Sequence, residues 1–130
     1  MKEYISLKIP KAPEYVSLVR LNSSAVANTM AFDFEEIDDI KIAVAEACNS
    51  IIEDGQGEDS CIEICYEKGL DYLTIEIKTD SKISCQMEKA EDPLNQNLSM
   101  IIIQTIMDEV ECIDKEFNGV RMTKRIGVDA

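Results

Sequence analysis

Apolar and polar residues alternate near the start of the chain. Ile5, Leu7 and Ile9 occupy every second position over residues 4–9, and Pro10 follows them. A period of two is typical of a β-strand with one buried face, and proline cannot donate to the hydrogen bonds of a sheet. This segment therefore predicts a first strand that ends at Pro10.

Two segments with a helical period come next. The first begins at Pro13, whose missing N–H is tolerated in the first turn of a helix, and runs towards Met30. The second begins near Asp33 or Phe34, and Asp33 and Glu36 have the spacing of a capping box. Its apolar residues recur at positions 37, 40, 44, 47, 48 and 51, which places one face of this helix in the core.

The second half of the chain predicts two hairpins and one more helix. The expected elements are strands at 61–67, 72–78, 110–114 and 120–126 and a helix from residue 97 or 98 to 107. Residues 80–96 have neither period and are expected to form an unusually long connection.

The order of these elements predicts the fold class. It reads strand, two helices, two strands, helix, two strands, and hairpins join neighbouring strands in antiparallel fashion. We therefore predict a single α+β domain over residues 1–130, a two-layer sandwich in which three helices cover one face of a mostly antiparallel sheet. The other sheet face is free for solvent or a partner.

The charge of the chain narrows the classes of partner. Thirteen Lys and Arg against 26 Asp and Glu give a net charge of −13, which argues against nucleic acid and anionic membrane surfaces. The densest basic stretch, with Arg121, Lys124 and Arg125, is interpreted as a solvated strand face. The chain has no histidine, so Ser-His-Asp triads, Cys-His dyads and His-liganded metals are excluded, and a general base must be a carboxylate.

The absence of targeting signals and the pattern of cysteines both favour the cytoplasm as the location. No apolar stretch approaches the ~20 residues of a membrane span, and no signal-peptide core follows the first residues. The five cysteines are odd in number and contain no Cys-x-x-Cys pair. We therefore expect a cytoplasmic protein, without membrane contact, whose five thiols are reduced.

One carboxylate of the second helix is a candidate for chemistry. Glu46 falls nearly opposite the apolar stripe, and Asn49 and Ser50 neighbour it three and four residues on. A carboxylate beside an amide or a hydroxyl can hold a cation or orient a hydroxyl nucleophile. An ordinary solvated glutamate on an outer helix face is the alternative.

Three segments of the chain carry a family resemblance. They are APEYV at 12–16, FEEIDDIKIAVAEAC at 34–48 and MDEV at 107–110. The chain resembles the bacterial anti-sigma factor serine kinases of the RsbW and SpoIIAB type, within the GHKL ATPases, over nearly all its residues in order. The resemblance implies the histidine kinase-like ATPase fold, ATP and Mg²⁺ as cofactors, a homodimer, and a sigma factor and an anti-anti-sigma protein as partners.

The resemblance also implies roles for single residues. Glu46 matches the glutamate that activates the acceptor serine, and the magnesium-binding Asn of the family falls at Ser50, with Asn49 one position early. Asp80 matches the aspartate that accepts the adenine amino hydrogen, whereas Lys82 stands at the position of a glycine and is a candidate phosphate contact.

The remaining matches concern the phosphates, the adenine and the partner surface. Asn97 and Ser99 fall on the two glycines of a Gly-x-Gly segment, and Thr123 matches a threonine that assists at the adenine. Glycine lets backbone N–H groups approach phosphate oxygens, so its replacement predicts weaker phosphate binding. Glu14 and Arg20, on the exposed side of the first helix, are the candidate partner contacts.

The sequence thus predicts an anti-sigma-factor-like regulator whose ATP binding and serine kinase activity are weakened or lost. An active ATP-dependent serine kinase that phosphorylates an anti-anti-sigma factor is the alternative, and a nucleotide-free dimer that serves as a structural module is a third. Plainer roles also stay open: Asp80 as a turn cap, Thr123 as a β-branched strand residue, and Asn97 or Ser99 as the cap of the third helix.

Overall fold

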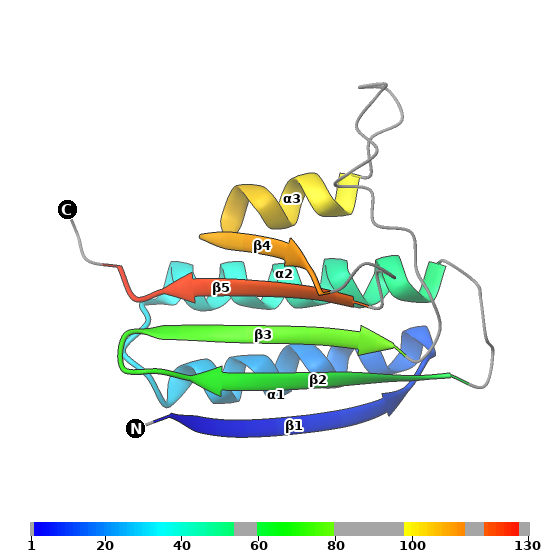
Figure 1. Cartoon of the computed structure of the whole chain (residues 1–130), viewed down its shortest axis with the longest axis horizontal. Coiled ribbons are helices and arrows are strands. Elements are labelled where there is room, and N and C mark those ends of the chain that lie inside the picture. Colours follow the sequence, from blue (N-terminus) through cyan, green and yellow to red (C-terminus); the bar gives the residue numbers. More distant parts are fainter. Residues whose placement is uncertain (1, 54–59, 80–97, 114–118, 128–130) are drawn as a thin grey trace.

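A five-stranded sheet and three α-helices form two layers (Figure 1). The computed structural model describes residues 2–53, 60–79, 98–113 and 119–127, and every structural statement below concerns these residues. The elements are β1 (Glu3–Pro10), a 3₁₀ turn (Pro13–Tyr15), α1 (Val16–Asn28), α2 (Phe34–Glu53), β2 (Cys61–Lys68), β3 (Tyr72–Thr79), α3 (Leu98–Ile106), β4 (Glu109–Cys112) and β5 (Gly119–Arg125).

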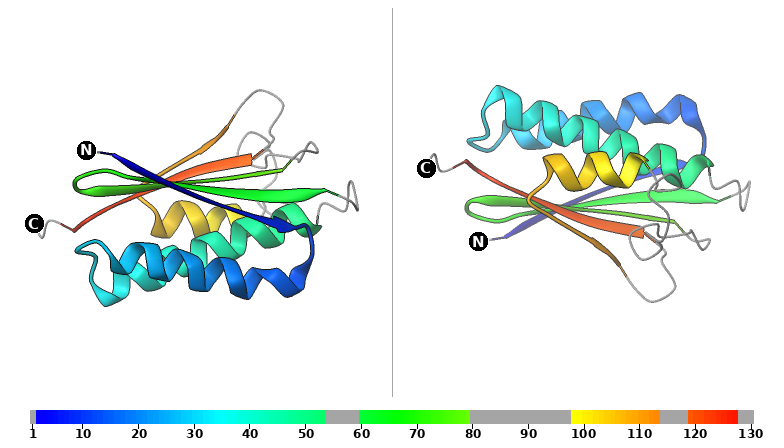
Figure 2. Two further views of the ribbon diagram at one scale, coloured as in Figure 1. Left: turned by 90° about the horizontal axis from the view of Figure 1, so that it is seen from below. Right: turned by 90° about the horizontal axis from the view of Figure 1, so that it is seen from above.

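The sheet has the strand order β1-β2-β3-β5-β4, and each pair of neighbours is antiparallel. Figure 2 shows that α1, α2 and α3 all lie on one side of it. The other side, called the open face below, carries no helix of the described chain. The predicted fold class, an antiparallel sheet with three helices on one face, is therefore confirmed.

The core lies between the sheet and the helices. Alternate strand residues such as Ile64, Tyr66 and Ile75 point into it, and they meet the apolar stripe of α2, which includes Ile40 and Cys48. Burial raises the pKa of the Cys48 thiol to about 12, so this cysteine packs as a small apolar side chain.

The start of α2 is fixed by the predicted capping box. The backbone N–H of Glu36 donates to Oδ1 of Asp33 over 2.8 Å, and the N–H of Asp33 donates to Oε1 of Glu36 over 2.8 Å. These two bonds satisfy backbone donors that a helix end leaves without partners. The first helix begins later than predicted, because Pro13 opens a 3₁₀ turn and α1 starts at Val16.

Two further expectations have mixed outcomes. Cys48, Cys61 and Cys65 are free thiols, but Cys112 is disulfide-bonded, so the prediction of five reduced cysteines is wrong there. Counting and spacing of cysteines do not show which ones the fold brings together. The long connection predicted at 80–96 lies outside the described residues.

None of the helices in the described ranges is long and apolar enough to cross a membrane.

Candidate functional site

The candidate site lies where α3 packs along one flank of α2. Asp39, Glu46 and Ser50 follow one another at intervals of seven and four residues, so they share this flank of α2. The start of α3 meets Glu46, and the end of α3 lies near Asp39, so the two helices run in opposite directions. We call this line of contact the α2–α3 seam.

A hydrogen bond joins the two helices at Glu46. The hydroxyl of Ser99, in the first turn of α3, donates to Oε1 of Glu46 over 2.7 Å. Both residues are half-buried. The alternative of an ordinary solvated glutamate on the outer face of α2 is therefore wrong, because α3 covers this flank, and the sequence of α2 alone does not reveal that neighbour.

Lys124 of β5 closes the other end of the seam. Its Nζ donates to the backbone carbonyl of Ile106 over 2.6 Å and to Oδ2 of Asp39 over 3.2 Å. The ammonium group thus joins the sheet to both helices and satisfies a carbonyl at the end of α3, where the helix dipole favours a cation. Only 12% of the Lys124 side chain is exposed, so it does not belong to a solvated strand face as the sequence reading proposed.

The donors near Glu46 suit a hard cation in their chemistry. Ser50 lies one turn beyond Glu46, and its Oγ is buried without a hydrogen-bond partner among the described residues. Asn49 is turned about 100° from Ser50 around the helix. Carboxylate, amide and hydroxyl oxygens are ligands that Mg²⁺ accepts. Within the described chain, no group of three or more Cys, Asp or Glu side chains gathers as a metal site.

The structure does not bring Thr123 to Glu46. Thr123 pairs with Thr74 across β5 and β3, and their hydroxyl oxygens lie 2.9 Å apart on the open face. Since side chains alternate along a strand, Met122 and Lys124 point to the helices and Thr123 points away from them. Thr123 thus lies on the opposite side of the sheet from Glu46, and its role at an adenine stays a prediction.

The other predicted site residues divide into two groups. Glu14, in the 3₁₀ turn, and Arg20, on α1, are exposed as expected of partner contacts. Asp80, Lys82 and Asn97 lie outside the described residues.

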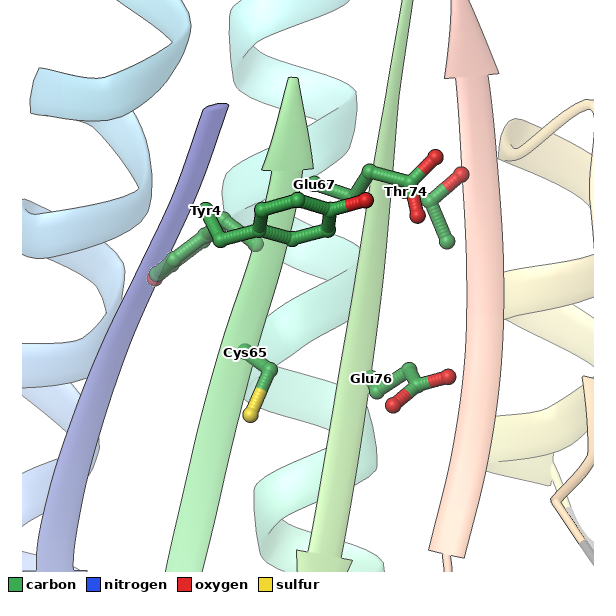
Figure 3. Close-up of a pocket in the computed structure, with 6 residues that line it drawn as sticks. Tyr4, Cys65, Glu67, Thr74 and Glu76 are labelled. Carbon is green, nitrogen blue, oxygen red and sulfur yellow. The ribbon is translucent and has the colours of Figure 1, made fainter. Parts of the chain in front are cut away.

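A separate pocket of about 260 Å³ lies on the open face (Figure 3). Its lining residues are Tyr4, Cys65, Tyr66, Glu67, Thr74 and Glu76. Partial burial and the carboxylate of Glu63 raise the pKa of the Cys65 thiol, which disfavours the nucleophilic thiolate. The Tyr72 hydroxyl donates to Glu67 and lowers its pKa. The Glu67 carboxylate of the pocket is therefore already hydrogen-bonded, and its Cys65 thiol is not activated as a nucleophile.

A comparison with models of known protein families shows which class of domain this chain is. The family model of the histidine kinase-like ATPase domain matches residues 9–124, which include α1 to β4, β5 except its last residue, and the α2–α3 seam. The chain is thus a histidine kinase-like ATPase domain by class.

Curated relatives narrow the class to one family. The chain is 34% identical to the serine-protein kinase RsbW of Bacillus cereus (strain AH820) over 137 aligned residues, which cover 95% of this chain and 86% of that protein. It is 32% identical to RsbW of Bacillus subtilis (strain 168), with 94% and 85% covered. The chain belongs to the RsbW family of anti-sigma factor serine kinases.

A solved structure shows the same fold. The RsbU and RsbW domains of Rv1364c from Mycobacterium tuberculosis superpose with a TM-score of 0.72 over 98% of this chain and 34% of that longer one. At 14% sequence identity, this likeness supports the fold alone.

Proposed function

We propose that this chain is an anti-sigma-factor-like regulator that acts by binding proteins, with weakened ATP binding and serine kinase activity. The observation that carries this proposal is the incomplete arrangement around Glu46. The glutamate and an oxygen donor, Ser50, share the α2–α3 seam, whereas Thr123 faces the opposite side of the sheet. Ser99 also carries a side chain at a position where the resembling kinases have a glycine, which restricts close approach of phosphate oxygens to the backbone.

An active serine kinase is the second candidate function. The retained carboxylate of Glu46 favours it, because it lies half-buried beside a hydroxyl group. ATP, when bound with Mg²⁺, supplies the phosphoryl group for such a reaction. Glu46 then accepts the proton of the acceptor serine, and Asn49 and Ser50 are the residues of this chain that would hold the cation.

Titration with ATP and Mg²⁺ by calorimetry separates the two candidates. A regulator with weakened ATP binding gives no heat of binding up to about millimolar ATP. A dissociation constant in that range corresponds to a binding free energy of only ~4 kcal/mol. Binding in the low micromolar range that is lost in an Asp80→Asn variant favours the kinase instead. A Glu46→Gln variant then serves as the control, because it keeps nucleotide binding and loses transfer.

The proposed partners are a sigma factor and an anti-anti-sigma protein. Because sigma factors act in the cytoplasm, we also propose that this chain is cytoplasmic. Sigma factors bind DNA through basic surfaces, and a protein of net charge −13 is attracted to such a surface. The exposed side of α1 offers Arg20 together with two apolar side chains, Leu18 and Leu21, which are 46% and 69% exposed. Apolar contacts with a charged rim are typical of protein interfaces.

Co-purification tests the partner proposal. A basic sigma-like protein should bind the wild-type chain at low and at moderate salt, and a Leu18→Ser, Leu21→Ser variant, which leaves the net charge unchanged, should bind it at least tenfold more weakly. A Leu70→Ser variant is the matched control, because Leu70 is exposed in the turn between β2 and β3. Failure to recover any sigma-like protein would refute the anti-sigma proposal.

We also propose that the chain forms a homodimer through the open face. The described charged side chains on this face are five basic and five acidic ones: Lys2, Lys8, Lys78, Arg121 and Arg125 against Glu63, Glu67, Glu76, Glu109 and Glu111. A surface without net charge on a strongly acidic molecule is suited to a second copy of the same chain, because long-range repulsion is smallest there.

A further inference from the structure

Ser99 is the residue of α3 that reaches the glutamate of the candidate site. We propose that the Ser99 hydroxyl slows phosphotransfer by occupying the Glu46 carboxylate in place of the acceptor serine of a partner. The inference rests on the second candidate function, the serine kinase, since it concerns the glutamate that accepts the proton in that reaction. It assigns to Ser99 the part of a positioning residue, which acts on the reaction through Glu46.

In the transfer step, the hydroxyl of the acceptor serine makes the same kind of contact with Glu46 as the Ser99 hydroxyl makes in the structure. In that step the acceptor oxygen forms a bond to the γ-phosphorus of ATP, and the bond from this phosphorus to the β,γ-bridging oxygen breaks as ADP leaves. The proton of the acceptor hydroxyl passes to the Glu46 carboxylate. Ser99 presents the same neutral O–H donor to the same carboxylate, over 2.7 Å. It therefore competes with an acceptor serine for Oε1, the carboxylate oxygen to which it is bound.

The surroundings of Glu46 strengthen the role of Ser99. Within the described residues, Glu46 has no ion pair, so the Ser99 hydroxyl supplies the contact that holds its carboxylate. Lys124 is the basic side chain at the other end of the seam, and it is bound by Asp39 and the Ile106 carbonyl. The start of α3 keeps Ser99 in place, because the helix packs along α2. An acceptor serine that approaches Oε1 of Glu46 meets the Ser99 hydroxyl already bound to this oxygen.

Three substitutions isolate this contact. Ser99→Ala removes the hydroxyl, and Ser99→Thr keeps one. Thr105→Ala is the matched control on the same helix, because the Thr105 hydroxyl is exposed and donates to the carbonyl of Ile101 within α3. Circular dichroism and thermal melts of all three establish that the fold is retained before binding is compared.

The first measurement needs no nucleotide. The probe is a STAS-type anti-anti-sigma protein, prepared with its acceptor serine and, separately, with alanine at that position. We expect Ser99→Ala to bind the serine form roughly 3- to 10-fold more tightly than wild type, the range that one exchanged hydrogen bond spans. Ser99→Thr and Thr105→Ala should bind it as wild type does. With the alanine form of the probe, Ser99→Ala should show no advantage, because the competing hydroxyl is absent.

The second measurement is phosphotransfer at saturating ATP and Mg²⁺. Ser99→Ala should raise kcat severalfold and leave the KM for ATP unchanged, whereas a residue that only stabilises the fold would lower activity when removed. Equal binding of both probe forms by wild type and Ser99→Ala, or slower transfer by Ser99→Ala, would overturn the inference and leave partner binding standing. If none of the variants binds either form, the proposed function fails and the inference fails with it.

Discussion

At the residue scale, a buried pair of hydroxyl groups joins α1 to the sheet. The oxygens of Ser23 and Tyr66 lie 2.7 Å apart, and both residues are buried. Ser23→Ala leaves the Tyr66 hydroxyl without this partner, and an unsatisfied buried polar group costs about 1–3 kcal/mol. We therefore expect urea denaturation to show a loss of unfolding free energy in this range.

Two further variants separate the hydrogen bond from a general effect of alanine on the helix. Ser17→Ala changes an exposed serine of the same helix and should alter the unfolding free energy by less than about 0.5 kcal/mol. The double variant Ser23→Ala, Tyr66→Phe should be more stable than the sum of its single variants predicts, because it removes both polar partners. Simple additivity would show that the pair is not coupled.

The same tyrosine predicts a dependence on pH. Burial raises the pKa of Tyr66 to about 12, so the folded state favours the neutral phenol. The resulting stabilisation is fully present below the unfolded pKa, near 10, and is lost as the pH rises from there towards 12. Between pH 9 and pH 11.5 the wild type should therefore lose more unfolding free energy than Tyr66→Phe. Parallel curves for the two proteins would contradict the assignment.

At the scale of single elements, the capping box fixes the start of the helix that carries Glu46. Asp33→Ala removes the side chain that accepts from the Glu36 backbone and should cost about 1 kcal/mol. Asp38→Ala is the matched control, because Asp38 is exposed and its oxygen lies 3.9 Å from Lys41, a surface contact of little value. Thermal melts should show a lower Tm for Asp33→Ala and little change for Asp38→Ala.

The α2–α3 seam predicts that one lysine holds three elements together. Lys124→Met keeps the aliphatic packing but removes the ammonium group that binds Asp39 and the Ile106 carbonyl. We expect a loss of about 1–2 kcal/mol in unfolding free energy. Amide hydrogen exchange should accelerate in α3 more than in α1, since α1 makes no contact with this group. Uniform exchange changes would refute this local role.

The elements that sequence predicted well are those with local causes. Alternation of Ile62 and Ile64 with polar residues, the short turn at 68–71 and the Asp33–Glu36 spacing each act within a few residues, and all three appear in the structure. The pairing of β3 with β5 joins residues that are more than forty positions apart, from Lys78 with Gly119 to Tyr72 with Arg125, and no local signal specifies it.

The candidate site was harder to predict because it is assembled by tertiary packing. The helical period shows that Glu46 lies outside the apolar stripe, but not that α3 covers this flank and brings Ser99 to it. The faces of Thr123 and Lys124 were predictable: Met122 is apolar and points to the core, so its neighbour Thr123 must point away and Lys124 must share its face. A residue match to a family motif does not replace this test of strand parity.

At the scale of the whole molecule, the net charge of −13 limits how two copies can meet. Repulsion between the two chains is long-ranged and is weakened by salt, whose screening length is about 10 Å at 0.1 M. The open face adds little to this repulsion, because its charges are paired within the sheet: Arg121 binds Glu76 and Glu111, and Arg125 binds Glu109. The net charge of the two whole chains still repels, and salt screens this repulsion, so dimerisation through this face should become stronger between 20 and 150 mM salt.

A single added charge tests which face the copies use. Tyr4 is 70% exposed beside the pocket of the open face, so Tyr4→Glu adds a negative charge to a balanced surface. We expect the dimer dissociation constant to rise about tenfold, or ~1.4 kcal/mol, in sedimentation equilibrium. Leu70→Glu adds the same charge at a side chain that is 92% exposed in the β2–β3 turn, and should change the constant much less. Equal effects of the two substitutions would mean that total charge, and not the open face, governs association, and a wild type that stays monomeric at high concentration would refute the dimer itself.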